Sequence, residues 1–172
     1  HSAWVARYRP EAARAARAEA LFNKSSPFVS GMALYLTALL LVFAGWATRR
    51  SDLAAAARAL AWAAFTVHTA GLLAHSVLQG RPPVTNLYSS AVFVGWAAAV
   101  LGLFSERFHK KGFAVAGACA IGFTTLIIAH HLKASGDTME MMRAVLDSNF
   151  WLATHVVAIT IGYSSTYLAG ML

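Results

Sequence analysis

Long stretches without a charged side chain are the feature of this sequence that most limits its fold. Five runs lack Asp, Glu, Lys and Arg altogether, and they cover residues 27–48, 59–80, 84–105, 112–132 and 148–172. A helix that crosses the hydrocarbon core of a bilayer needs about 20 mostly apolar residues. Buried helices of soluble proteins are rarely so long and so free of charge. The sequence therefore predicts an all-α fold, a polytopic integral membrane bundle of about five transmembrane helices.

Charge is scarce in the whole chain. Charged residues make up 12% of its 172 residues, against about 25% in a soluble domain. The formal net charge of +7 does not indicate nucleic acid, because Lys and Arg of membrane proteins gather at helix ends beside lipid headgroups. A single cysteine, Cys119, excludes a disulfide framework and a CxxC redox pair. We expect the lipid bilayer, and no nucleic acid, among the partners.

The N-terminal segment, residues 1–26, differs in composition from the rest. It is rich in Ala, Arg and Glu, and Pro10 suits the first turn of a helix. These features predict a basic amphipathic helix on the membrane surface, followed by a five-helix transmembrane domain over residues 27–172. We expect the protein to continue beyond Leu172, where the last apolar run stops without a polar flank.

The loops between the runs predict an orientation. The short basic loops contain TRRSD and SERFHKKG, and short basic loops stay on the cytoplasmic side. This places the opposite loops on the outer side of the membrane. The loop GRPPVTNLY would then be an external turn, in which Pro82 and Pro83 stop a helix and Asn86 or Thr85 caps the next one. A turn alone does not require Arg81 or Tyr88.

Five histidines fall within the predicted helices: His68, His75, His130, His131 and His155. All but the first would lie near the outer face. Ionisable groups in a bilayer usually face the bundle interior or a cavity, and imidazole there ligates haem iron or relays protons. A hydrogen bond between helices is the simpler interpretation for His68. The absence of an HExxH motif and of carboxylates in the runs argues against a zinc hydrolase.

Small residues near the end of the chain predict close helix packing. Gly162 and Thr166 are four residues apart in TIGYSSTYLAG, so they share a helix face. Such spacing lets two membrane helices approach closely.

Two segments together resemble the cytochrome c assembly protein family, the membrane haem-handling subunit of system II c-type cytochrome biogenesis. The segments are GRPPVTNLYSS and SNFWLATHVVAITIGYSSTYLAG, and they occur in the order found in that family. The matching positions are Gly80, Arg81, Pro83, Thr85, Asn86, Tyr88, Trp151, Leu152, His155 and Tyr163. Ser89 departs from the acidic residue that many members have there.

The resemblance implies a function, the presentation of haem b at the outer membrane face for covalent attachment to apocytochrome c. It implies His155 as an axial ligand of the haem iron, with cofactor contacts from Arg81, Trp151, Tyr88 and Asn86. The guanidinium of Arg81 suits a haem propionate. The tryptophan-rich segment and second histidine of such proteins are expected beyond this sequence. The segment alone would then be an inactive part of a cytochrome c synthetase (haem lyase), working with a second membrane subunit or fused domain.

Two other functions remain open from the residues. A b-type haem electron carrier would pair His68 or His75 with a histidine of the fourth helix. A transporter or membrane scaffold would need no cofactor.

Overall fold

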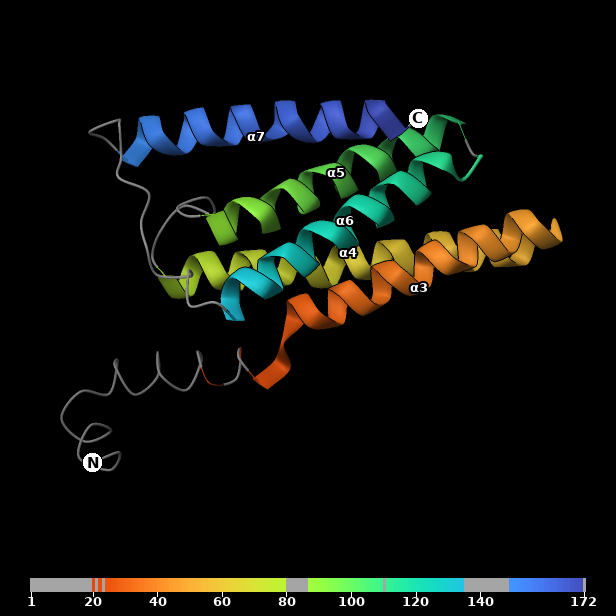
Figure 1. Cartoon of the computed structure of the whole chain (residues 1–172), viewed down its shortest axis with the longest axis horizontal. Coiled ribbons are helices and arrows are strands. Elements are labelled where there is room, and N and C mark those ends of the chain that lie inside the picture. Colours follow the sequence, from red (N-terminus) through yellow and green to blue (C-terminus); the bar gives the residue numbers. More distant parts are fainter. Residues whose placement is uncertain are drawn as a thin grey trace.

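The computed structural model describes residues 20, 22, 24–79, 87–109, 111–134 and 149–171. Five long helices occupy this part of the chain (Figure 1): α3 (Pro27–Thr48), α4 (Ser51–Gln79), α5 (Leu87–His109), α6 (Phe113–Ala134) and α7 (Asn149–Met171). The predicted surface helix of residues 1–26 lies largely outside the described residues, as do Arg81 and Asn86. The predicted all-α fold is confirmed.

Four of these helices are long and apolar enough to cross a membrane. The candidate spans are Pro27–Thr48, Ser51–Leu78, Leu87–Phe108 and Phe113–Lys133. The protein is therefore a multi-pass membrane protein with an α-helical bundle. α7 contains 23 residues, and its crossing of the bilayer stays a prediction.

The start of α4 differs from the charge-free run that indicated this helix. The run begins at residue 59, whereas α4 begins at Ser51 and includes Asp52 and Arg58. The intervening residues are mostly Ala, the strongest helix former, and both charged side chains are exposed near the end of the helix. A search for uncharged residues cannot detect such an extension.

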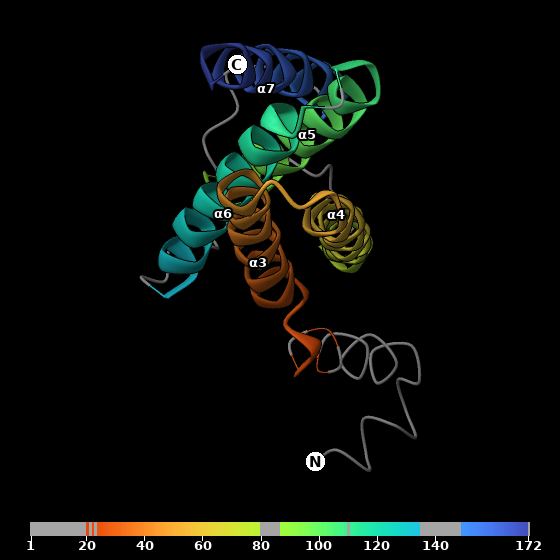
Figure 2. The same ribbon diagram turned by 90° about the vertical axis from the view of Figure 1, so that its right-hand side faces the viewer.

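The helices alternate in direction, as Figure 1 shows. α3 and α4 form one antiparallel pair and α5 and α6 form another. α6 packs against α3, whereas α7 lies mainly on α5 (Figure 2). As a result α3, α5 and α7 begin at the same end of the bundle at which α4 and α6 finish. We call this the histidine end, because His75, His130, His131 and His155 belong to these helix termini.

Small residues bring α5 and α6 close together. A Cβ atom added to Gly102 of α5 would lie 2.6 Å from the Cβ of Ala118 and 2.8 Å from the carbonyl oxygen of Ala114, both in α6. The close packing predicted at Gly162 is not found, because an added Cβ there meets nothing within 4 Å. Gly162 and Thr166 are both exposed on α7. The small residue of this segment that does pack is Ser164, which is buried and whose hydroxyl donates to the Val94 carbonyl oxygen of α5 at 3.2 Å.

Candidate functional site

Four aromatic rings meet at the histidine end. The His75 ring of α4 lies 5.5 Å from the Tyr88 ring of α5, measured between centroids, and the two planes are inclined by 61°. Phe28, from the first turn of α3, contacts both rings edge-on, at 6.3 Å from each. Phe22 lies 6.2 Å from His75 and 6.1 Å from Phe28. We call these four residues the aromatic cluster, and it joins three helices.

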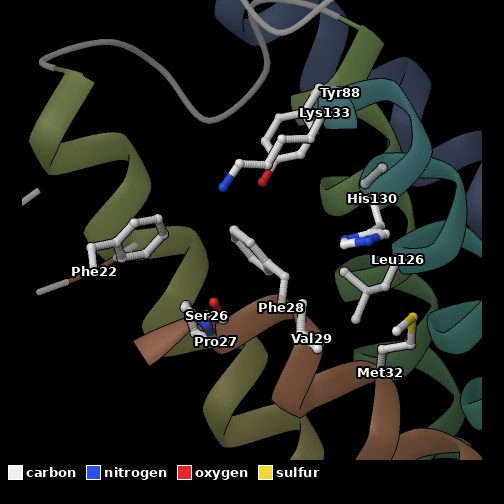
Figure 3. Close-up of a pocket in the computed structure, with 11 residues that line it drawn as sticks. Phe22, Ser26, Pro27, Phe28, Val29, Met32, Tyr88, Leu126, His130 and Lys133 are labelled. Carbon is white, nitrogen blue, oxygen red and sulfur yellow. The ribbon is translucent and has the colours of Figure 1, made fainter. Parts of the chain in front are cut away.

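A cavity of about 140 Å³ opens beside the aromatic cluster. Figure 3 shows its walls, with Tyr88, His130 and Lys133 on one side and Phe28, Val29 and Pro27 on the other. The remaining lining residues are Phe22, Ser26, Met32, Leu126 and Ala129. The walls are mostly apolar and carry a few polar groups, as binding pockets do.

Nitrogen-bearing side chains lie on one side of this cavity. Lys133 and His130, both exposed, approach it from the last turns of α6. Behind the rings, the Nε2 atom of His75 is buried and makes no hydrogen bond within the described structure. Lys133 also acts electrostatically on His75. A buried polar atom without a partner is costly, so the imidazole is a group that a ligand or a water molecule can satisfy.

His68 lies two turns before His75 on the same face of α4, deeper in the bundle core. Its side chain is fully buried, its Nδ1 lies 3.4 Å from the Tyr35 hydroxyl, and its Nε2 lies 3.1 Å from the Val92 carbonyl oxygen. The predicted interhelical hydrogen bonding of His68 is therefore confirmed. Both ring nitrogens have partners, so iron ligation by this residue requires one of these contacts to break.

His155 lies near the start of α7 and is exposed. The next two residues, Val156 and Val157, pack against the core instead. This arrangement leaves the imidazole accessible at the histidine end. His131 is also exposed, but its Nδ1 lies 2.9 Å from the Ile127 carbonyl oxygen of the preceding turn.

The residues expected to bind the cofactor are only partly described. Tyr88 is 6% exposed and belongs to the aromatic cluster. Trp151 falls within α7, but its side chain lies outside the described residues, as do Arg81 and Asn86 entirely. Within the described part of the chain, no group of three or more His, Cys, Asp or Glu side chains could hold a metal ion. A single axial imidazole needs no such group.

The sequence alone did not point to Phe28, and it indicated Lys133 only as one of the loop charges. Phe28 follows Pro27 at the start of α3, and a lone aromatic residue at a membrane interface is too common to stand out. Lys133 ends an apolar helix, where cations are also common. Only the packing of α3, α5 and α6 shows that the two residues share a cavity.

The fold and the site define a polytopic α-helical membrane protein with a partly polar cavity at one end of its bundle. No family model matches the chain. It is similar to the cytochrome c biogenesis protein CcsA of Synechococcus sp. (strain CC9605), with 27% identity over 83% of this chain and 46% of that protein. These matches confirm the predicted resemblance to the cytochrome c assembly protein family.

Two further relatives support this resemblance. Protein NrfI of Wolinella succinogenes is 28% identical over 86% of this chain and 17% of its own length. The CcsA protein of Prochlorococcus marinus (strain NATL2A) is 28% identical over 85% of this chain and 47% of its own length. The chain thus spans less than half the length of each of these relatives.

Proposed function

We propose that this chain handles haem in cytochrome c biogenesis and presents it at the outer face of the bacterial inner membrane to apocytochrome c. The observation that carries the proposal is the exposed position of His155 at the histidine end. An imidazole that the bundle leaves accessible can ligate the iron of a haem held outside the helices. The family relationship supplies the context of cytochrome c biogenesis.

The cavity beside the aromatic cluster is too small to hold a haem within it. Pockets that enclose a drug-sized ligand measure roughly 300–1,000 Å³, whereas the cavity beside the aromatic cluster measures about 140 Å³. The cavity cannot enclose the macrocycle, which is itself larger than many such ligands. A haem on the outer surface has its vinyl groups free to meet another protein, as presentation requires.

The chain's own contribution to the reaction is positioning. Each thioether bond forms when a cysteine S–H of apocytochrome c adds across a vinyl double bond of haem, so the thiols supply the nucleophile and the proton. The chain would bind the iron through His155 and orient the ring through Arg81, Asn86, Tyr88 and Trp151. Holding two reactants in a productive geometry is a large contribution to rate.

A b-type haem electron carrier is the second candidate, and one observation favours it. The buried Nε2 of His75 makes no hydrogen bond within the described residues, so it is available as a ligand inside the membrane. A haem at that place would have to displace the Tyr88 and Phe28 rings that contact His75. The closed packing of the aromatic cluster therefore makes this the weaker candidate.

The test compares three single variants of the intact protein, purified from the membrane: His155→Ala, His75→Ala and His131→Ala. We expect His155→Ala to lose most of the Soret absorbance and the cytochrome-maturing activity, and added imidazole to restore part of the absorbance. His131→Ala, which removes another exposed imidazole from the same end, is the matched control and should keep both. A loss of haem with His75→Ala but not with His155→Ala would establish the electron carrier instead. A wild-type protein without a Soret band would point to a cofactor-free transporter or scaffold.

A further inference from the structure

Among the described residues, Lys133 forms no ion pair. The described residues that line the cavity include no Asp or Glu. In the part of the chain that the structure describes, the ion pair that does form joins Arg50 and Asp52 at the opposite end of the bundle. His75 and His130, the other titratable nitrogen groups nearby, cannot neutralise an ammonium group. The cavity is therefore a place where a negative charge would be stabilised.

The shape of the cavity limits the ligand. A cavity of about 150 Å³ holds a group of about the size of benzene, and this one measures about 140 Å³. Its inner walls are apolar, formed by Phe28, Met32 and Leu126 among others, while Lys133 stands at its rim and is exposed. In Figure 3 the polar ends of Tyr88 and Lys133 point the same way, toward the side where Phe28 lies.

We propose that this cavity binds the anionic oxygen group of an amphiphile, with Lys133 as its counter-ion and the Tyr88 hydroxyl as a second donor. A short alkyl arm would contact Phe28 and Leu126 in the apolar interior. Two amphiphiles at this membrane face offer such a group, namely haem through a propionate and a phospholipid through its headgroup phosphate. The haem source rests on the proposed function, whereas the phospholipid source does not.

The geometry favours the propionate of the two sources. A phosphate is normally bound at the interface by exposed Lys or Arg without an apolar cavity. A propionate has two methylene groups before its carboxylate. The methylene groups can fill the apolar space while the carboxylate reaches the ammonium group of Lys133. The arm would also hold the ring at the histidine end, where His155 is exposed.

The experiment compares the affinity of the intact protein for haem with its affinity for haem dimethyl ester, which lacks both carboxylates. Both affinities are measured by Soret titration in phosphatidylcholine nanodiscs. The wild type should bind haem roughly three- to tenfold more tightly than the ester, the range expected for one partly exposed charge-assisted contact. Lys133→Met should weaken this preference, and Lys133→Arg should retain it. Lys111→Met, which removes an exposed charge from the opposite end of the bundle, is the matched control.

A second measurement distinguishes binding of a phospholipid phosphate from binding of a haem propionate. The same variants are placed in nanodiscs that contain phosphatidylglycerol, and the lipid retained after detergent extraction is quantified by mass spectrometry. A lower retention with Lys133→Met, with the preference for haem over its ester intact, assigns the cavity to lipid phosphate. If neither quantity changes with Lys133→Met, the cavity binds no anion and the inference is wrong.

The two proposals fail in different ways. His155→Ala should weaken haem and its ester equally, because the iron is common to both, and should leave their ratio unchanged. If the wild type binds neither haem nor ester, the proposed function fails and the propionate source fails with it. The phospholipid measurement then still decides whether Lys133 holds an anion.

Discussion

The ring of Tyr88 packs edge-on against the ring of His75, with 5.5 Å between their centroids. The two residues start and finish neighbouring helices, since Tyr88 is in the first turn of α5 and His75 is in the last turns of α4. Their contact therefore fixes the distance between the end of α4 and the start of α5. A tyrosine that a turn alone would not require is explained by this packing.

Shortening Tyr88 should loosen the histidine end. Tyr88→Ala removes a ring that is only 6% exposed and contacts both His75 and Phe28, and we expect a loss of about 3 kcal/mol in the free energy of unfolding. Tyr88→Phe keeps the ring and should lose less than about 1 kcal/mol. Thermal unfolding in detergent measures both. Equal losses in the two variants would show that the hydroxyl, and not the ring, stabilises this end.

The buried contacts of His68 should matter for stability and not for haem. His68→Leu breaks the contacts to the Tyr35 hydroxyl and the Val92 carbonyl oxygen. Hydrogen bonds between membrane helices contribute on average about 0.6 kcal/mol each, so we expect a loss of about 1 kcal/mol. Tyr35→Phe, which removes one contact, should lose about half as much. Haem content, read from the Soret band, should stay at the wild-type level. A His68→Leu protein that has lost its Soret band would contradict a purely structural role for His68.

The fold class could be predicted from the sequence because charge is excluded from a bilayer. Charge-free runs indicated each of the five helices, and the structure places a helix at every one. The runs did not show that α4 extends through Arg58 and Asp52 to Ser51. Charged side chains are compatible with a helix wherever they reach water, so the absence of charge indicates a membrane span but not the ends of its helix.

The contacts of the candidate site could not be predicted in the same way. In a soluble protein the apolar face of a helix marks its buried side, but in a membrane the lipid is as apolar as the neighbouring helix. The sequence therefore drew attention to His75 and Tyr88 separately without showing that Phe28 joins them. The same limit explains why Gly162 looked like a packing residue and Gly102 did not.

The two glycines make a direct comparison. Gly102→Ala places a methyl group 2.6 Å from the Cβ of Ala118, so α5 and α6 must separate, and we expect a loss of about 1–3 kcal/mol. Gly162→Ala meets nothing within 4 Å and should be neutral or stabilising by up to about 1 kcal/mol, from helix propensity alone. Denaturation curves of both variants check this. A Gly162→Ala protein as unstable as Gly102→Ala would mean that α7 packs more closely than the structure shows.

The turn between α5 and α6 gives the last prediction. Glu106 is 5% exposed, and its Oε1 accepts a hydrogen bond of 2.8 Å from the backbone N–H of Gly112. Gly112 has a positive φ of 83°, a conformation that suits glycine, and the Trp46 indole donates to the neighbouring Lys111 carbonyl oxygen at 3.3 Å. These two bonds fasten the turn to α5 and α3. The other carboxylate oxygen of Glu106, Oε2, has no hydrogen-bond partner within the described residues.

Glu106→Ala should therefore destabilise the turn, because it leaves the partly buried N–H of Gly112 without its acceptor. The expected loss is about 1–3 kcal/mol in the free energy of unfolding. Glu106→Gln keeps an oxygen that can accept the same bond and should stay within about 0.5 kcal/mol of the wild type. Amide hydrogen exchange gives a local readout, since the Gly112 N–H should exchange faster only in the Ala variant. If both variants exchange as slowly as the wild type, the backbone alone holds the turn and the carboxylate has another role.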